Sequence, residues 1–300
     1  MMQMHEPLSA TSMRVSLFDL RHTFESAQPL TFHADYDAQG NTLTYTAGNH
    51  IINVAHGGDA TSGDLTVVSK DIRFAEREVR RRFRLSDNMR YMYKRIGTDR
   101  FMERAIARYK GMRLTVNDPW ETTLVFIISQ FNNVKRIRLI TKNIIERFGR
   151  KIADDSGNVV ARSFPDSRDL MGATEKDFRE CGAGFRAKYL KELSEYCTVN
   201  IDLYKLDGKR YDELKEQLMS IKGVGEKVAD CIALMGYGNL EAFPIDVWVK
   251  RTMERAYFKG RKKKEKEIRE FAEGKWGRYS GYAQQYVFWG GRQTDKEIVG

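Results

Sequence analysis

The spacing of the apolar residues changes near Ile72, and this change limits the fold more than any other feature of the chain. Before it, short segments either alternate roughly between apolar and polar residues or form brief apolar runs, as strands do. Glycine-containing turns separate them. After it, apolar residues recur at three- and four-residue spacing, which indicates helices. The predicted strands are Ser12–Leu20, Asn41–Ala47, Ile51–Val54 and Leu65–Val68.

Strands followed by helices indicate an α+β fold, with a small N-terminal antiparallel β-sheet before a helical body. The 300 residues are long for one compact core and suit two packed subdomains. We therefore expect a β-rich domain at 1–85 and a two-lobed helical body at 86–300. The predicted helices are Asp71–Phe83, Asp99–Tyr109, Pro119–Gln130, Val134–Phe148 and Phe185–Tyr196.

Positive charge is in excess along the chain. Lys and Arg number 51 against 41 Asp and Glu, which gives a formal net charge of +10. This excess favours a polyanionic partner such as nucleic acid, although solubility alone could account for it. Two runs concentrate the charge, RRRFR at Arg80–Arg84 and RKKKEK at Arg261–Lys266. Such runs are more often solvated helix faces than phosphate sites, so both interpretations stay open.

The cysteines and histidines are too few and too far apart for a metal site. There are three cysteines, and all five histidines lie in the first 56 residues. The odd, sparse cysteine count also favours a reducing compartment. Neither a signal peptide nor a membrane span is recognisable. We expect no metal, no cofactor and no membrane contact, and a monomer in the cytoplasm, nucleoid-associated if prokaryotic.

Residues 211–233, YDELKEQLMSIKGVGEKVADCIA, combine two helical segments with a glycine turn. The first helix is expected to end near Ser220 and the second to start at Glu226. Gly223 and Gly225 permit positive φ and leave the backbone bare, so the N–H groups that begin the second helix can bind a phosphate. The pattern is typical of the helix-hairpin-helix of DNA-binding proteins. An ordinary αα-hairpin is the alternative.

Two residues near this turn could carry chemistry. Lys227 is the second residue of the new helix, where the helix dipole favours the neutral amine that a nucleophilic lysine needs. An ordinary surface lysine is the alternative. Asp246, within FPIDVWVKRTM at 243–253, is placed as a helix N-cap. A capping carboxylate is held rigidly with one face free, and beside a sugar it could stabilise positive charge at C1′ and assist proton transfers.

At this point the chain resembles a known family. GVGEKVADCIALM followed by AFPIDVWVKR is similar to the signature of the helix-hairpin-helix DNA glycosylases, in the branch of the 8-oxoguanine DNA glycosylase/lyases. Further segments resemble the family in the expected order. They are GMRLTVNDPWETTLVFIISQFNNVKRI at 111–137, CGAGFRAKYL at 181–190, GYAQQYVF at 281–288 and, more weakly, ESAQPLTF at 25–32.

The resemblance implies roles for the residues around the reacting nucleotide. Lys227 falls on the lysine that attacks C1′, and Asp246 on the catalytic aspartate. Cys231 and Phe288 fall on residues that sandwich the extruded base. Gln284 falls on the glutamine that hydrogen-bonds the base's Watson–Crick edge. Without the resemblance, the last three would be taken for core or surface residues.

The resemblance also implies contacts with the DNA opposite the lesion. Arg136 and Arg186 match the arginines that read the orphaned cytosine, although simple phosphate contacts are the alternative. Phe185 stands where the family inserts an aromatic wedge into the duplex. Asn132 and Asn133 lie in the loop that faces the gap.

Three positions depart from the family pattern. Phe131 replaces the first asparagine of a triplet, so we expect looser reading of the opposite base, with stacking to fill the gap. Trp248 stands in place of a phosphate-contacting histidine. Ala27 stands at the glycine whose carbonyl accepts from N7–H of the oxidised base, and its methyl group adds bulk to the pocket.

The residues and the resemblance together imply a bifunctional DNA glycosylase/AP lyase of base excision repair. It would excise an oxidised purine, 8-oxoguanine opposite cytosine, from double-stranded DNA by Schiff-base chemistry. Two alternatives stay open. One is a related helix-hairpin-helix glycosylase for another damaged base, and the other is a non-catalytic DNA-binding helix-hairpin-helix protein.

Overall fold

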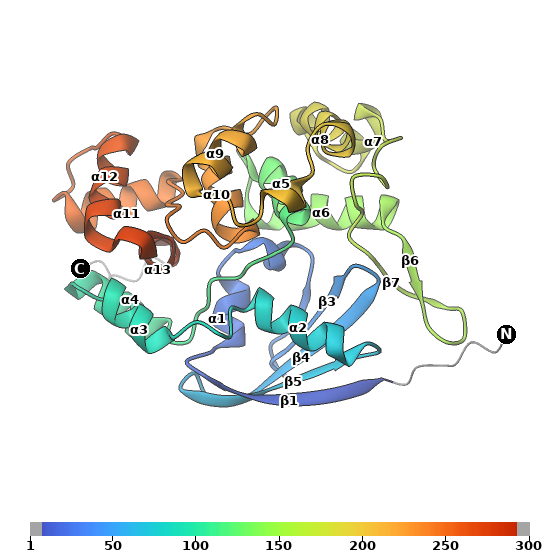
Figure 1. Cartoon of the computed structure of the whole chain (residues 1–300), viewed down its shortest axis with the longest axis horizontal. Coiled ribbons are helices and arrows are strands. Elements are labelled where there is room, and N and C mark those ends of the chain that lie inside the picture. Colours follow the sequence, from blue (N-terminus) through green and yellow to red (C-terminus); the bar gives the residue numbers. More distant parts are fainter. Residues whose placement is uncertain (1–7, 293–300) are drawn as a thin grey trace.

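The structure is a computed structural model that describes residues 8–292. Its N-terminal part is a five-stranded antiparallel sheet, and a helical body follows (Figure 1). The strand order across the sheet is β1-β5-β4-β3-β2, so the first strand pairs with the last. The strands are β1 (Ser9–Ser16), β2 (Asp35–Asp37), β3 (Thr42–Ala47), β4 (His50–Gly58) and β5 (Ser62–Ser69). The predicted α+β architecture is confirmed.

The helices follow the sheet, apart from one that lies between its first two strands. They are α1 (Leu20–Glu25), α2 (Ile72–Arg82), α3 (Met89–Ile96), α4 (Arg100–Arg108), α5 (Pro119–Ser129), α6 (Val134–Phe148), α7 (Glu175–Glu180), α8 (Ala187–Val199), α9 (Tyr211–Met219), α10 (Glu226–Gly236), α11 (Val247–Tyr257), α12 (Glu265–Trp276) and α13 (Ser280–Arg292). A hairpin of β6 (Lys151–Ala153) and β7 (Val159–Arg162) extends from the body beside the sheet (Figure 1).

Local sequence signals explain where the observed elements differ from the predicted ones. The first strand ends at Ser16 instead of continuing to Leu20, because Asp19 accepts a hydrogen bond from the His22 backbone N–H at 2.7 Å and begins α1. The sequence did not predict α3, although its three buried apolar residues have helical spacing and Asn88 caps it. The β6–β7 hairpin was also missed, because its strands are short and largely exposed.

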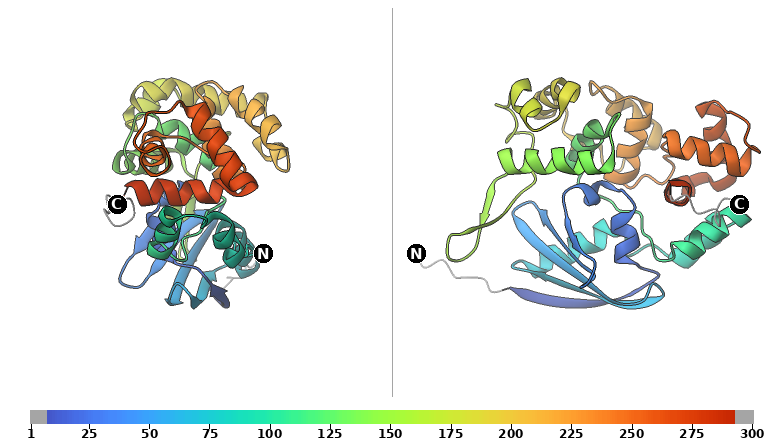
Figure 2. Two further views of the ribbon diagram at one scale, coloured as in Figure 1. Left: turned by 90° about the vertical axis from the view of Figure 1, so that its left-hand side faces the viewer. Right: turned by 180° about the vertical axis from the view of Figure 1, so that it is seen from behind.

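Two apolar cores hold the molecule together. One lies between the sheet and α2, and the larger one fills the helical body, where α5 packs against α10. Every residue of α5 from Trp120 to Ile128 is buried, so this helix forms the centre of the body. Figure 2 shows the helical body stacked on the sheet-containing part in both views.

A buried glutamine joins the sheet-containing part to the helical body. Gln28 is fully buried, and its side chain donates to the Arg113 carbonyl at 2.9 Å and accepts from the Thr115 N–H at 2.7 Å. The segment around Ala27 is therefore fixed to the helical body.

The predicted domain boundary after residue 85 stays a prediction. The outer ends of the two predicted ranges, 1–7 and 293–300, lie outside the described residues. Within the described part of the chain, no helix is both long and apolar enough to cross a membrane.

Candidate active site

A cavity of about 270 Å³ opens where the first turns of α10 and α11 meet α13 and the Ala27 segment. Six residues that were predicted to surround the reacting nucleotide line it together: Ala27, Lys227, Cys231, Asp246, Gln284 and Phe288. They come from four separate stretches of the chain. The fold therefore places these predicted chemical groups around one space.

Lys227 lies in the first turn of α10, as predicted. The helix begins at Glu226 after Gly225, and no side chain caps it, which leaves its first backbone N–H groups available to a ligand. The Lys227 ammonium lies 5.6 Å from the centre of the Phe126 ring, which also lines the cavity. Among the residues that the structure describes, Lys227 forms no ion pair with a carboxylate.

Cys231 lies one turn further along α10 and is buried. Burial raises the pKa of its thiol to about 11, with Lys227 acting against the rise and Asp246 adding to it. The thiol is therefore protonated at neutral pH and offers an apolar, polarisable surface to the cavity. The opposing influences of Lys227 and Asp246 reflect how close both charges lie to this sulfur.

Asp246 is the N-cap of α11, as the sequence predicted. One carboxylate oxygen, Oδ1, accepts from the backbone N–H groups of Trp248 at 2.9 Å and Val249 at 2.7 Å. The cap fixes the carboxylate at the cavity wall. A rigid anion beside a nucleophilic amine can stabilise a developing cation between them.

Gln284 presents an unused acceptor to the cavity. Its side-chain nitrogen donates to the Pro244 carbonyl at 3.1 Å, whereas Oε1 is buried and has no hydrogen-bond partner among residues 8–292. A carbonyl can only accept, so this bond determines which end of the amide is oxygen. A buried acceptor without a partner is rare in native proteins and indicates a ligand or water.

Ala27 lies at the edge of the cavity with φ of +58°. This is the left-handed region, which glycine adopts at little cost and alanine does not. The flanking Ser26 and Gln28 are both fully buried and hydrogen-bonded to each other's side chains at 2.9 Å. The surrounding structure thus holds an unfavourable backbone conformation at the position where the family has glycine.

A second hollow adjoins the first, because Asn132 and Asn133 line both. It also contains Phe131 and Phe185, whose side chains are 94% and 53% exposed. The two ring centres lie 6.3 Å apart. Two exposed aromatic rings beside a cavity are suited to stacking on bases.

The polar residues of this second hollow are used differently from what the sequence suggested. Arg186 is buried, and its guanidinium donates to the carbonyls of Gln130 and Phe131. It therefore braces the loop that presents Phe131. Asn132 donates to the Ile128 carbonyl at 3.1 Å.

Arg136 is the predicted reader of the opposite base whose side chain is least engaged by other residues of the described chain. Asn133 accepts from the Arg136 backbone N–H at 3.0 Å and so caps α6, which occupies the asparagine side chain. For the Arg136 guanidinium, by contrast, no hydrogen bond or ion pair is recorded within the described chain. Its side chain remains available to a ligand in the hollow.

The glycine turn has the predicted position but only one glycine needs positive φ. Gly223 has φ of +88°, and a β-carbon there would lie 2.9 Å from the Tyr189 ring. Gly225 has φ of −91° and so does not use the left-handed region that a glycine permits. A β-carbon at Gly225 would meet no neighbour, so the glycine is not required by packing. Its lack of a side chain leaves the start of the α10 backbone open to an approaching ligand.

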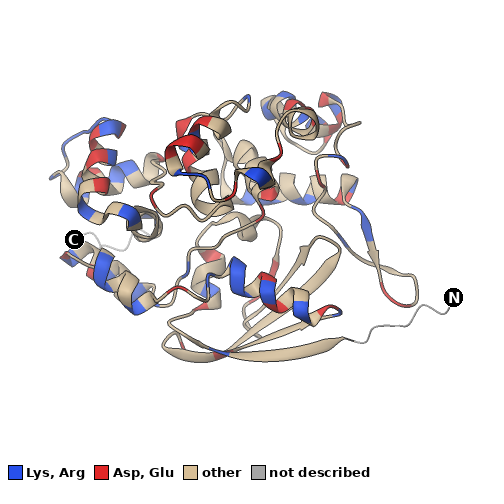
Figure 3. Cartoon of the chain, viewed as in Figure 1, with Lys and Arg blue, Asp and Glu red and all other residues tan. Residues whose placement is uncertain are grey.

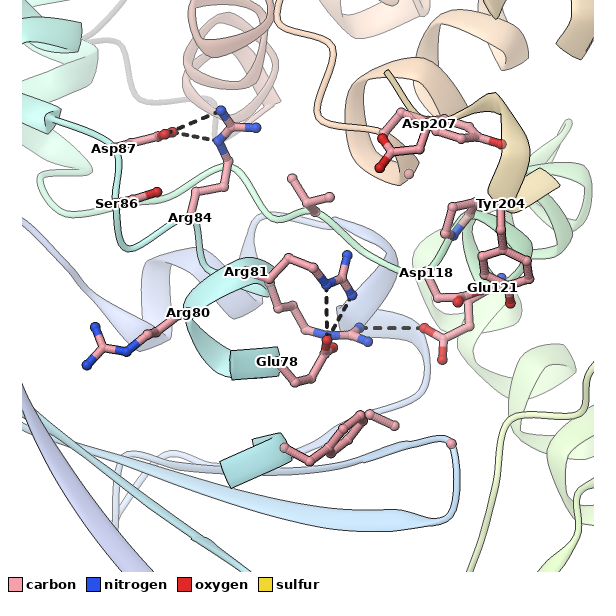
Figure 4. A pocket seen from close by; sticks show the side chains of 18 residues that line it. Glu78, Arg80, Arg81, Arg84, Ser86, Asp87, Asp118, Glu121, Tyr204 and Asp207 are labelled. Carbon is pink, nitrogen blue, oxygen red and sulfur yellow. Dashed lines mark hydrogen bonds and ion pairs between the residues drawn. The ribbon is translucent and has the colours of Figure 1, made fainter. Parts of the chain in front are cut away.

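The RRRFR run is mainly structural. Its arginines line a larger cavity, of about 750 Å³, between α2 and the start of α5, where Figure 4 labels Arg80, Arg81 and Arg84. Arg82 is buried and pairs with Glu78 at 2.7 Å, and Arg84 pairs with Asp87. Arg80 and Arg81 pair with glutamates of α2, where Figure 3 shows both signs of charge. Carboxylates pair with these cations, which favours the helix-face interpretation of the run over the phosphate site that the sequence left open.

The RKKKEK run lies in the loop before α12 and in its first turn. Lys262 pairs with Glu254 at 3.1 Å and Lys263 with Glu267 at 2.6 Å, which corresponds to the solvated, internally paired interpretation. Within residues 8–292, no group of three or more His, Cys, Asp or Glu side chains is arranged to hold a metal ion.

Comparison with models of protein families shows to which family the chain belongs. Residues 124–278, just over half of the chain, match the model of the HhH-GPD superfamily base excision DNA repair proteins. The chain belongs to this superfamily. The matched HhH-GPD region runs from within α5 to just past the end of α12 and therefore includes Lys227, Cys231 and Asp246.

Individual HhH-GPD relatives are similar over longer stretches. A probable N-glycosylase/DNA lyase of Methanothermobacter thermautotrophicus is 33% identical over 60% of this chain and 63% of its own length. The N-glycosylase/DNA lyase of Saccharomyces cerevisiae is 33% identical over 73% of this chain and 65% of its own. The chain thus spans slightly less than two thirds of these curated relatives.

Solved structures are similar over nearly the whole chain. The structure of MBOgg1 in complex with a low-affinity DNA ligand has a TM-score of 0.86 and 30% identity, over 96% of this chain and 99% of that one. The 8-oxoguanine glycosylase/lyase of Clostridium acetobutylicum, in complex with double-stranded DNA containing cytosine opposite 8-oxoguanine, has a TM-score of 0.85 and 29% identity, over 96% and 98%.

Phe126 and Gln285 are among the cavity residues of this HhH-GPD protein that sequence reasoning missed. Phe126 lies in α5, where every neighbour is also buried, so periodicity could not distinguish a cavity-facing residue. Gln285 follows Gln284 directly and is buried in the same cavity. The sequence shows only a glutamine within a largely apolar helical segment. A single sequence cannot distinguish such a cavity residue from one on the surface.

Proposed function

We propose that this protein is a bifunctional DNA glycosylase/AP lyase of base excision repair that removes an oxidised purine from double-stranded DNA. The proposed lesion is 8-oxoguanine opposite cytosine. One observation supports this most directly: Lys227, Asp246 and the unpartnered Gln284 oxygen line a single cavity. A nucleophile, a cation stabiliser and an acceptor for a base edge are the parts that such a reaction requires.

The cavity suits a base extruded from the duplex. Its walls include Cys231 and Phe288, an apolar sulfur and an aromatic ring between which a purine can stack. Gln284 offers an acceptor, so it selects a base edge that carries donors, such as the N1–H and exocyclic amine of a guanine derivative. The exposed rings of Phe131 and Phe185 are placed to fill the gap left in the duplex.

DNA binding is proposed to rest on the backbone around the hairpin. The uncapped start of α10 offers N–H groups and the positive end of a helix dipole to a phosphate. Gly225 lets the DNA backbone approach without a side chain in between. The net charge of +10 supports binding to a polyanion. We propose that the protein acts as a monomer in the cytoplasm, or at the nucleoid in a prokaryote.

The reaction follows from the side chains in the cavity. The neutral Lys227 amine attacks C1′ while the bond between C1′ and N9 breaks and its electron pair leaves with the base, which takes up a proton. Asp246 stabilises the positive charge that develops on the sugar. The attached nitrogen then loses a proton, the bond between C1′ and O4′ breaks and O4′ takes up a proton, so the sugar ring opens. The resulting iminium between Lys227 and C1′ acidifies the C2′ proton. Its removal expels the 3′-phosphate by β-elimination, and hydrolysis of the imine then frees the lysine.

Borohydride trapping tests this proposal. The protein is incubated with a duplex that carries one 8-oxoguanine opposite cytosine, and the imine is reduced to a stable adduct. Wild type and Lys205→Gln, an exposed lysine remote from the cavity, should form the adduct, whereas Lys227→Gln should not. An undiminished adduct with Lys227→Gln, or none with wild type, would contradict the mechanism. Binding without cleavage would favour a non-catalytic DNA-binding protein, and reaction only with another damaged base a related glycosylase.

A further inference from the structure

Gln285 is a second buried glutamine in the cavity, and the proposed mechanism does not use it. It is 1% exposed and lines the same space as Lys227 and Gln284. Its side-chain nitrogen donates to the Ser26 carbonyl at 2.9 Å, which joins α13 to the segment that precedes Ala27. The side chain is therefore anchored to a different segment from the one that anchors Gln284 through Pro244.

The free end of Gln285 is an acceptor. Because the Ser26 carbonyl can only accept, the atom that bonds to it is nitrogen and the other is Oε1. Oε1 is buried, and the described part of the chain provides no hydrogen-bond partner for it, as is also true of Gln284 Oε1. Leaving two such acceptors unsatisfied in one small cavity is unfavourable, so the cavity is built for a ligand that donates to both.

The two acceptors cannot serve the same edge of a base. Adjacent residues of a helix point about 100° apart, and here they are anchored to different walls. A ligand that satisfies both must carry N–H donors on two edges. 8-Oxoguanine does so, with N1–H and the exocyclic amine on one edge and N7–H on the other. Unmodified guanine has a lone pair at N7 and would place it against an acceptor.

We propose that Gln285 determines specificity for the oxidised base, with Oε1 accepting a hydrogen bond from N7–H. This inference rests on the proposed function above. The bond to Ser26 holds Gln285 beside Ala27, whose backbone carbonyl is the other acceptor expected at this edge, and the two can share the hydrogen in a three-centre bond. Guanine is then rejected because its N7 leaves both acceptors unsatisfied.

The test compares a change in the side chain with a change in the base. Single-turnover excision is measured for wild type and Gln285→Leu on 8-oxoguanine and on 8-methoxyguanine, which keeps the Watson–Crick edge but has no N7–H. Wild type should excise 8-oxoguanine at least about tenfold faster than 8-methoxyguanine. Gln285→Leu should lose about tenfold or more on 8-oxoguanine and little on 8-methoxyguanine, so that the preference collapses.

A purely bracing role gives a different result. If Gln285 only holds the Ser26 segment, the substitution slows both substrates by the same factor and the preference persists, which overturns the inference alone. Wild type that acts on neither base overturns the proposed function as well.

Two controls complete the experiment. Borohydride trapping on an abasic duplex needs Lys227 but no base, so Gln285→Leu should match wild type within about twofold. Gln39→Leu, an exposed glutamine in the turn between β2 and β3, should keep the full preference. If Gln285→Leu does not fold, Gln285→Met keeps the length of the side chain without its polar atoms and has the same two outcomes.

Discussion

The rings of Phe131 and Phe185 lie with their centres 6.3 Å apart, although 54 positions separate them in the sequence. The loop after α5 presents the first with φ of +49°, and the turn before α8 presents the second. Arg186 joins the two segments through the carbonyls of Gln130 and Phe131. An aromatic pair stacks on any base, whereas amide groups select by hydrogen bonding.

Phe131 should therefore weaken discrimination between opposite bases. We expect wild type to excise 8-oxoguanine at rates within about tenfold opposite all four bases, and Phe131→Asn to increase the preference for cytosine. The measurement is single-turnover excision from the four duplexes. Tyr204→Ala, which removes an exposed aromatic residue elsewhere, should change nothing. A strict cytosine preference in wild type would show that Phe131 does not have this effect.

Asp246 combines a structural and a chemical role, which two substitutions can separate. Asn caps helices as well as Asp does, so Asp246→Asn should keep the thermal stability and lower base excision about 100-fold through loss of the negative charge. Asp246→Ala should lose the cap as well, at about 1 kcal/mol. Single-turnover rates and thermal unfolding check both. If Asp246→Asn retained full activity, the carboxylate would be only a cap.

Ala27 stores backbone strain at the edge of the cavity. Ala27 has φ of +58°, so its replacement by glycine relieves an unfavourable conformation of the folded chain. The same replacement makes the unfolded chain more flexible, which lowers the gain in stability. The net effect expected for Ala27→Gly is about 0.5–1 kcal/mol of added stability in urea unfolding. Ala10→Gly, at an exposed position in the extended strand β1, should instead be neutral or destabilising. Equal destabilisation by both would mean that the Ala27 conformation carries no strain.

Asp230 connects the hairpin to the C-terminal helices. It is fully buried and pairs with Lys215 of α9 at 3.0 Å and Arg269 of α12 at 2.6 Å. Asp230→Ala leaves these cations only their longer contacts with Glu226, at 3.8 Å and 3.6 Å, so the free energy of unfolding should fall by about 3 kcal/mol. Asp212→Ala, at an exposed position in α9, should cost less than about 1 kcal/mol. Chemical denaturation measures both, and equal losses would contradict this role of the network.

Glu121 should make stability depend on pH. Burial raises the pKa of its carboxyl to about 8, although Arg82 acts against the rise. Other groups near it are His33, whose pKa burial lowers to about 3, and the carboxylates of Glu78 and Asp118. The folded state holds a proton that the unfolded state releases above its ordinary pKa of 4.5. The stabilisation from Glu121 is therefore complete below pH ~4.5 and is lost as the pH rises through about 8.

The variant Glu121→Gln should remove this dependence. Relative to wild type, its free energy of unfolding should increase between pH 5 and 8, by ~1.4 kcal/mol for each pKa unit at most. Denaturant unfolding across this interval measures the difference. The exposed Glu273→Gln should run parallel to wild type at every pH. Parallel curves for Glu121→Gln as well would mean that Glu121 is ionised in the folded protein.

The sequence alone determined the elements whose signals are local. The spacing of apolar residues placed α6 at Val134–Phe148, and the glycine turn placed the start of α10 at Glu226. Asp246 was predicted as an N-cap because capping depends on a few neighbouring residues. The predicted cavity residues also came together, since the resemblance to a family carried information about distant contacts that periodicity lacks.

Only the tertiary structure decided which polar atoms are used and which are free. Lys227, Asp246 and Gln284 belong to one cavity because α10, α11 and α13 pack together, and nothing in their own segments fixes that arrangement. The arginines of RRRFR were neutralised by carboxylates that the folded chain brings to them. Gln285 could be recognised as a candidate for lesion recognition only after its nitrogen was seen to bond Ser26. Hydrogen-bond satisfaction depends on every neighbour in space, and a sequence specifies those neighbours only through the fold.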